Sequence, residues 1–233
     1  MTKTEVLKQL QSLGSASIKN IFLNHGAIEP VYGVKVGDLK TIQKKIKNDQ
    51  QLAMELYDSG VSDAMYLAGL VANGGKMTKK QLQDWAKKAS WYMISEYTVP
   101  WVTAESPFAY ELALEWIESK NANIASSGWA TLSGLLALKP DSEIDAKEVK
   151  AMLSRIEKTI HQSPNRVRYC MNGYIIAVGA YVAALSEQAI AVGKKIGEVK
   201  VDLGNTACQV PSAPEYIQKI KDRGAKKKKT LKC

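Results

Sequence analysis

The chain has 233 residues, of which 45% are apolar, enough to bury one hydrophobic core or the continuous core of a repeat array. Its formal net charge is +9, but residues 219–232 carry eight cations and one carboxylate, a local net charge of +7. Only +2 remains for the rest of the chain, which excludes a uniformly basic body: any DNA-binding face must come from segregated charge.

Membrane attachment and metal chemistry are not expected. A helix that crosses a bilayer needs about 18 uncharged apolar residues, and the apolar run at residues 174–185 is too short for that. The polar amino terminus shows no secretory signal. Cys170, Cys208 and Cys233 are far apart and in no metal-ligand spacing, while His25 and His161 stand alone. We therefore expect a cytoplasmic protein with no membrane, no metal and no cofactor.

Apolar residues at helical spacing, with caps and breakers between them, predict helix after helix along the chain. The first half is predicted to hold helices at residues 3–13, 16–24, 37–47, 50–57 and 64–72. Later helices are predicted to begin at the caps Thr78, Ser106, Asp145 and Ser212, with others at 122–138, 165–185 and 186–195. Residues 198–203 alternate in polarity, so that a short strand and an extended connector both stay open.

The order of helices predicts the fold class. Helix pairs restart near residues 37, 78, 107 and 145, and a period of about 30 to 40 residues is typical of an α-solenoid. We therefore predict an all-α fold of stacked antiparallel helix pairs, with one domain over residues 1–223 and a basic disordered tail at 224–233. A compact irregular bundle is the alternative, because no repeated motif accompanies the period.

Basic side chains gather on three of the predicted helices. One lysine stripe follows the helix at 37–47, and its alternative interpretation is a solvated helix face. The seven candidate contacts to a DNA backbone are Lys40, Lys44, Lys47, Lys87, Lys88, Arg166 and Arg168.

The stretch from Ser90 to Trp101 holds four aromatic rings and one carboxylate. At helical pitch Tyr92 and Glu96 lie on the same face, since they are four residues apart. Pro100 has no amide hydrogen, so a helix through this stretch loses one hydrogen bond and bends. This arrangement suggests a functional site. The alternative is a buried aromatic cluster in the helical core, with Glu96 at its solvent-exposed edge.

Three segments carry a family resemblance. Residues 32–40, Tyr-Gly-Val-Lys-Val-Gly-Asp-Leu-Lys, resemble an "FG(V/I)xxPxLR" segment, and residues 56–60, Leu-Tyr-Asp-Ser-Gly, resemble an "LW…E" repeat. Residues 77–91 resemble the helix that leads into a "WDxxD" motif. In this order, over most of residues 30–185, the chain is similar to the HEAT-like repeat DNA glycosylases of the AlkD type, the DNA alkylation repair enzymes.

The resemblance implies HEAT-like or ARM-like repeats and a chemistry. Alkylation at N3 or N7 gives a purine a positive charge that weakens its glycosidic bond. An enzyme then has only to stabilise a developing sugar cation and admit water. Aromatic faces favour the cations, and a carboxylate supplies the charge complement. The family grips duplex DNA on a concave basic surface and does not flip the base into a pocket.

The motif itself is incomplete in this sequence. With Trp91 as the family tryptophan, Ser95 stands where the carboxylate belongs. With Tyr92 in place of the family tryptophan, Glu96 stands at the carboxylate position. Both registers stay open.

Two other family positions have also changed. The family's arginine falls near residues 126–127, which are both serine, and a later tryptophan aligns best with Tyr174. The candidate catalytic set implied by the resemblance is Glu96, Tyr92, Trp91 and Tyr174.

Three functions follow as expectations. One is an alkylpurine DNA glycosylase of base excision repair, using the candidate catalytic set. The second is a DNA-binding repeat protein of the same ancestry, with affinity for distorted or branched DNA and no excision. The third is a protein-binding scaffold. The partner is expected to be duplex DNA, bound by a monomer in the cytoplasm that associates with the nucleoid.

Overall fold

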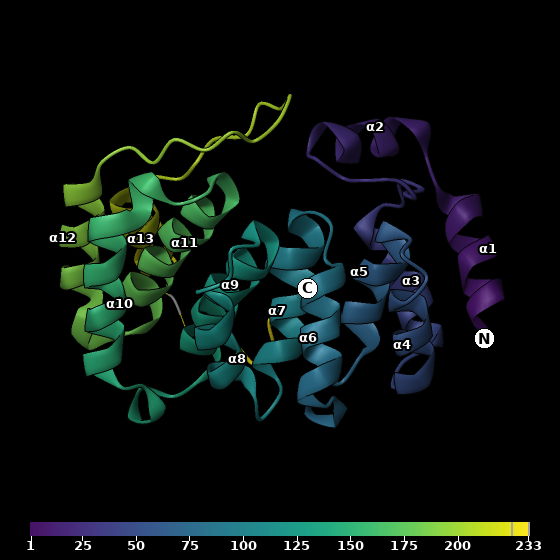
Figure 1. Ribbon diagram of the computed structural model, residues 1–233, viewed down its shortest axis with the longest axis horizontal. Helices are drawn as coiled ribbons and strands as arrows, with labels where there is room; N and C mark the ends of the chain where they lie inside the picture. Colours follow the sequence, from purple (N-terminus) through teal and green to yellow (C-terminus); the bar gives the residue numbers. More distant parts are fainter. Residues whose placement is uncertain (225, 233) are drawn as a thin grey trace. The chain divides into compact units, whose positions relative to one another are not determined.

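The computed structural model describes residues 1–224 and 226–232, and over these residues it contains thirteen α-helices and no β-strand (Figure 1). The chain divides into two compact units. Unit 1 comprises Met1–Phe108, Leu203–Ala207 and Lys232, and unit 2 comprises Ala109–Asp202 and Cys208–Leu231. The prediction of a single domain over residues 1–223 is not tested by this division.

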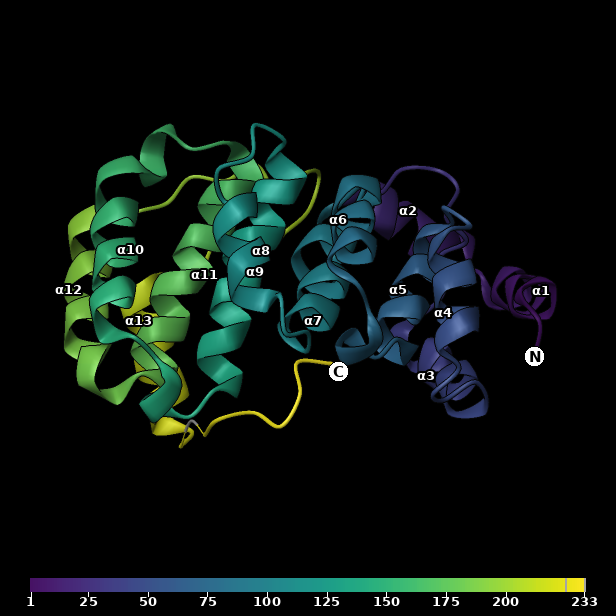
Figure 2. The ribbon, with the colours of Figure 1, turned by 60° about the horizontal axis from the view of Figure 1, so that its bottom comes forward.

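Unit 1 contains the first seven α-helices (Figures 1 and 2). They are α1 (Lys3–Leu13), α2 (Ala16–Asn24), α3 (Val36–Lys45), α4 (Gln50–Tyr57), α5 (Ser62–Val71), α6 (Lys79–Lys88) and α7 (Val99–Ala104). A 3₁₀ turn lies at Gly74–Lys76 and a π-helix at Met93–Thr98. Helix α5 is buried along its whole length, and α3, α4 and the π-helix pack against it.

Unit 2 contains the other six α-helices. They are α8 (Ala109–Trp116), α9 (Ala122–Leu138), α10 (Ala146–Thr159), α11 (Asn165–Tyr181), α12 (Ser186–Ile196) and α13 (Ala213–Asp222). Short 3₁₀ turns lie at Asp141–Glu143, Ile160–Gln162 and Ala183–Leu185. Helix α11 is the centre of the core, because α9, α12 and α13 all pack against it.

Local signals place most helix ends correctly. The predicted bounds of α1, α2, α4 and α9 agree with the structure. The capping box predicted at Thr78 is present, since its side chain accepts from the Gln81 amide and the Gln81 side chain accepts in return. At Asp145 only the forward half forms: its carboxylate caps α10, while the Glu148 carboxylate accepts a hydrogen bond from Tyr110.

Four predicted ends were wrong. Helix α5 begins at Ser62, two residues before its predicted start. Helix α3 stops at Lys45, which leaves Lys47 beyond the helical stripe. Helix α8 begins at Ala109, because the Ser106 hydroxyl accepts from the Phe108 amide and closes a turn there. The helix predicted to run to residue 185 ends at Tyr181 and continues as a 3₁₀ turn.

Residues 198–203 form a connector without regular secondary structure, so the strand alternative is not realised. No single helix among the described residues is long and apolar enough to cross a membrane. One pair of consecutive helical segments reaches that length and composition when the two are taken together: Asn165–Tyr181 and Ala183–Ile196. The chain bends by 117° between them.

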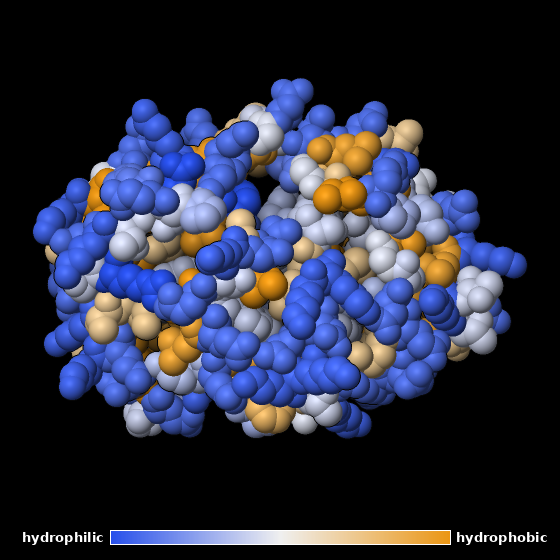
Figure 3. All heavy atoms as spheres, in the orientation of Figure 1, coloured by the Kyte–Doolittle hydropathy of each residue, from blue (hydrophilic) through white to orange (hydrophobic). Residues whose placement is uncertain are grey.

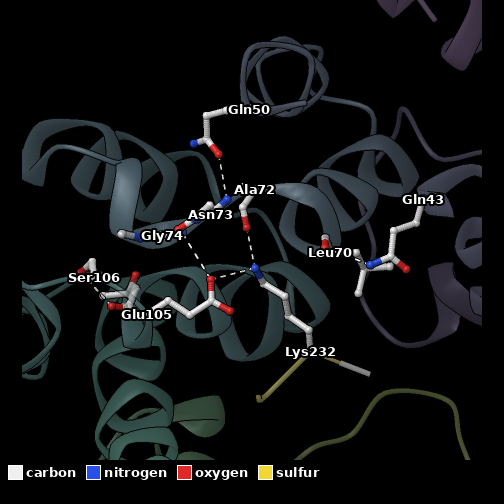
Figure 4. A network of polar contacts seen from close by, with 11 residues as sticks. Gln43, Gln50, Leu70, Ala72, Asn73, Gly74, Glu105, Ser106 and Lys232 are labelled. Carbon is white, nitrogen blue, oxygen red and sulfur yellow. Dashed lines mark hydrogen bonds and ion pairs between the residues drawn. The ribbon is translucent and has the colours of Figure 1, made fainter. Parts of the chain in front are cut away.

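Two lysines of the lysine-rich chain end make contacts with the helices. In unit 1, the Lys232 ammonium donates to the Ala72 carbonyl oxygen and lies 2.8 Å from a Glu105 carboxylate oxygen, which also accepts from the Gly74 amide (Figure 4). In unit 2, the Lys227 ammonium donates to the Leu136 carbonyl oxygen at 2.9 Å. Disorder of the tail over 224–233 stays a prediction, and residues 225 and 233 lie outside the described chain.

Candidate nucleic-acid interface

The predicted helix break at Pro100 takes the form of a π-helix. A proline cannot donate the backbone hydrogen bond that an α-helix needs at its position. In the structure the Val99 amide donates to the Ile94 carbonyl oxygen five residues earlier, and the Thr98 hydroxyl donates to the Met93 carbonyl oxygen at 3.2 Å. The turn is therefore widened, and π-turns of this kind are frequent at functional sites.

The widened turn aligns a series of rings, which we call the aromatic row: Phe22, Trp91, Tyr92, Tyr97 and Trp101. The ring centroids of Tyr92 and Tyr97 are 6.2 Å apart, a five-residue spacing that suits a π-helix. The centroids of Trp91 and Tyr92 are 5.2 Å apart in an edge-to-face arrangement. His25 extends the row, with its ring 5.9 Å from that of Tyr92. All of these residues belong to unit 1.

The two adjacent rings differ in exposure, as the sequence predicts for residues about 100° apart around a helix. Trp91 is buried, with 5% of its surface exposed, whereas Tyr92 is half-buried. Tyr97 is 37% exposed. A fully buried aromatic core is thus excluded for this row, because Tyr92 and Tyr97 present ring surface to solvent.

Neither candidate carboxylate position faces solvent. Ser95 is fully buried, and its hydroxyl donates to the Trp91 carbonyl oxygen one turn earlier. Glu96 lies on the π-helix with 8% of its surface exposed. The choice between these two registers stays a prediction.

The remaining catalytic candidates lie in unit 2. Ser126 and Ser127, which stand where the resemblance places an arginine, are fully buried in α9. Tyr174 is 2% exposed and meets Trp129 edge-on, with ring centroids 5.6 Å apart. The structure therefore joins Trp91 and Tyr92 within unit 1, whereas Tyr174 belongs to a different cluster.

The candidate DNA contacts divide between the two units. In unit 1, Lys40 is half-buried on α3, while Lys44, Lys47, Lys87 and Lys88 are exposed. Lys88 is already engaged in part, because its ammonium lies 2.6 Å from an Asp58 carboxylate oxygen. Exposed lysines of this kind can neutralise phosphates.

In unit 2, two arginines open α11. The Arg166 guanidinium lies over the Tyr169 ring, 4.5 Å from its centroid. Arg168 is half-buried, and its Nη2 is 3.5 Å from the Asn165 side-chain oxygen. Its Nε is buried with no hydrogen-bond partner in the described chain.

Helix α2 borders the aromatic row with an apolar surface that sequence reasoning missed. No residue of α2 is fully buried, and Ile21, Leu23 and nearby Ile28 are 46%, 37% and 57% exposed. Hydrophobic side chains are visible at the surface over this helix (Figure 3). Phe22 of α2 reaches Trp91, with ring centroids 5.5 Å apart.

Four residues of the candidate interface were not among the predicted site residues: Tyr97, Trp101, Phe22 and His25. Tyr97 was hidden because α-helical spacing pairs Tyr92 with Glu96, and only the π-turn brings Tyr97 beside Tyr92. Phe22 and His25 are some 70 residues distant in sequence, so no local pattern connects them to the row. No group of His, Cys, Asp and Glu in residues 1–224 and 226–232 is arranged to hold a metal ion.

The chain is similar to a known protein family and to proteins of two bacteria. A family model described as "DNA alkylation repair enzyme" matches residues 6–217. One protein of Listeria innocua and one of Listeria monocytogenes, both named only as uncharacterized, are each 36% identical over 221 residues, covering 92% of this chain and 95% of the relative.

One solved structure is similar along the whole chain. It is described as "a new family of proteins related to the HEAT-like repeat DNA glycosylases with affinity for branched DNA structures". It is 36% identical, with a TM-score of 0.91 and 100% coverage of both chains. This similarity confirms the predicted all-α, HEAT-like repeat fold class.

Proposed function

This chain belongs to the family of DNA alkylation repair enzymes, and from that premise we propose that it binds branched DNA without excising bases. The observation that carries the proposal is that neither candidate carboxylate position is exposed to solvent: Ser95 is fully buried and Glu96 is 8% exposed. A glycosylase of this type needs a negative charge beside the sugar cation that forms. A binder needs only the aromatic and basic surfaces.

The aromatic row suits a DNA branch point. Bases at a junction are less fully stacked than those inside a duplex, and exposed rings can stack on them without reading their sequence. Tyr97 is 37% exposed and Tyr92 is half-buried, so both offer ring surface. Helix α2 reaches the row through the contact of Phe22 with Trp91 and carries exposed apolar side chains. Apolar side chains inserted between bases stabilise unstacked DNA.

Two further properties belong to the proposal. Duplex arms are expected to contact the lysines of unit 1 and the arginines of unit 2 through their phosphates. The protein is expected to act as a monomer in the cytoplasm, associated with the nucleoid when it is bound to DNA. No cofactor is needed for this activity.

Binding and excision are separated by one experiment. The protein should bind a four-way junction more tightly than a linear duplex of the same length and composition, by at least tenfold in a fluorescence anisotropy titration. It should release neither 3-methyladenine nor 7-methylguanine from alkylated DNA above the spontaneous rate. Equal affinity for junction and duplex contradicts the junction preference, and enzymatic base release contradicts the absence of excision.

Excision by Glu96 is the second candidate function, because its carboxyl group lies on the same π-helix that carries the exposed Tyr97 ring. If the protein does release alkylated purines, Glu96→Gln should lower the release rate by about a hundredfold or more, since it removes one transition-state charge contact. DNA affinity should stay within about twofold. An equally active Gln variant would show that the Tyr92 register is wrong.

Tyr97→Ala is expected to lower junction affinity by about 5- to 150-fold, because stacking of one base on one ring is worth about 1–3 kcal/mol. Linear duplex affinity should change much less, since its bases are already stacked. Tyr216→Ala is the matched control, because Tyr216 is a 43% exposed tyrosine on α13, outside the aromatic row. Equal losses for the two variants would remove the aromatic row from the binding site.

A further inference from the structure

Unit 2 contains a pocket whose lining includes no residue of the aromatic row and none of the seven basic candidates. Its volume is about 240 Å³, and helices α8, α9 and α10 form its walls, with Tyr174 of α11 as a further lining residue. Most of the wall is aliphatic, with Leu132, Leu136 and Met152 among the lining side chains. The volume is slightly below that of typical small-molecule sites, about 300–1,000 Å³.

The polar groups of the pocket are few and converge. Tyr174 is 2% exposed, yet its hydroxyl has no hydrogen-bond partner among the residues described. Tyr110 and Glu148 also line the pocket, and the Tyr110 hydroxyl donates to the Glu148 carboxylate. Tyr174 lines the same pocket as these two groups. Burial raises the pKa of Tyr174, and the charges of Tyr110 and Glu148 raise it further.

An unpartnered hydroxyl on the pocket wall is available to a ligand. The Tyr174 hydroxyl, the Tyr110 hydroxyl and the Glu148 carboxylate are polar groups on a lining that is mostly apolar. A lining of this kind suits a ligand that has both an apolar body and a polar group.

The charge of the lining selects the sign of that polar group. Three carboxylates, Glu143, Asp145 and Glu148, line the pocket with a single ammonium, that of Lys139. Lys139 is opposed by Glu143, 3.6 Å away. Two negative charges remain, so an anion is disfavoured and a cation is favoured.

We propose that this pocket binds a small organic cation, an amine whose apolar body lies against the walls of α8, α9 and α10. Its ammonium group meets Glu148, Tyr110 and the free hydroxyl of Tyr174. The two tyrosine rings also offer their negative faces to a positive charge. This site is independent of the proposed DNA-binding activity, because none of its residues belongs to the aromatic row or to the seven basic candidates.

Phenethylammonium is a suitable probe, with 2-phenylethanol as the neutral analogue and phenylacetate as the anion. In two-dimensional amide NMR titrations, phenethylammonium should shift residues of α8, α9 and α10 saturably, with a Kd of about 1 mM or tighter. The alcohol should bind at least tenfold more weakly, and phenylacetate should not bind. Absence of saturable shifts at 10 mM phenethylammonium, or equal binding of the alcohol, would overturn the proposal.

Two conservative variants identify the polar groups. Glu148→Gln should weaken phenethylammonium binding about tenfold, and Tyr174→Phe, which removes only the hydroxyl, about fivefold. Glu157→Gln is the matched control: this carboxylate is also on α10 but pairs with Lys195 outside the pocket, so binding should be unchanged. Unchanged affinity in both Glu148→Gln and Tyr174→Phe, with their amide spectra otherwise native, contradicts the site.

Discussion

The affinity of this protein for DNA is expected to fall about a thousandfold to ten-thousandfold between 50 and 200 mM salt. If the seven basic candidates each contact one phosphate, the slope of log affinity against log salt is about −6, because each neutralised phosphate releases close to one counterion. Anisotropy titrations of one junction at several salt concentrations measure this slope. A slope between 0 and −2 would show that few of the seven contact DNA.

Replacing single lysines shows which residues contribute to the slope of log affinity against log salt. Lys44→Gln should make the slope shallower by about one and weaken junction and duplex binding alike, since phosphate contacts carry no sequence information. Lys195→Gln is the control: this exposed lysine of α12 is paired with Glu157 and lies outside the candidate set.

A chain that ends at residue 223 should bind DNA more weakly than the full chain but should still bind it. Complete loss of affinity in that shorter chain would place the binding site in the tail and not in the helical body.

Asp63→Ala is expected to lower the free energy of unfolding by about 2–6 kcal/mol. Asp63 is 3% exposed, at the start of α5, and its two carboxylate oxygens accept from the amides of Tyr32 at 2.6 Å and Val34 at 2.8 Å. Alanine leaves both amides without a partner, at about 1–3 kcal/mol each. Urea unfolding followed by circular dichroism measures the change.

The control for that substitution is a surface carboxylate of the same type. Asp58 is 53% exposed and pairs with Lys88, so Asp58→Ala should cost about 1 kcal/mol or less. Asp63→Asn should fall between the two, because the amide keeps one acceptor oxygen for one of the two backbone donors. If Asp63→Ala unfolds at the same urea concentration as Asp58→Ala, residues 32–34 are not held by Asp63.

This pair of hydrogen bonds also explains a segment that carried the family resemblance. Residues 32–40 were recognised by their residue order alone. In the structure, Tyr32 and Val34 bind Asp63, and Gly33 adopts a positive φ of 79°. A side chain at Gly33 would approach the Lys19 amide nitrogen to 2.3 Å. The segment is therefore a structural anchor between α2 and α5.

The amino-acid sequence alone determined the fold class and most helix bounds of this protein. Helix ends at residues 13, 24, 57 and 138 agree with the structure because they depend on local signals: apolar spacing, caps and breakers within a few residues. The incomplete motif was also visible, since Ser95 and Glu96 are read directly from the chain. The split between buried Trp91 and half-exposed Tyr92 followed from helix geometry alone.

Only the tertiary structure decided which of these residues meet. The π-turn at Pro100 sets Tyr97 beside Tyr92, and α2 adds Phe22 from the opposite end of unit 1's sequence. Packing also sets Tyr174 against Trp129 in the lining of the unit 2 pocket, and its role at a DNA site stays a prediction. Local patterns report the interactions of residues a few positions apart. Contacts between distant helices depend on which apolar faces exclude water together, and that is settled only when the whole chain packs.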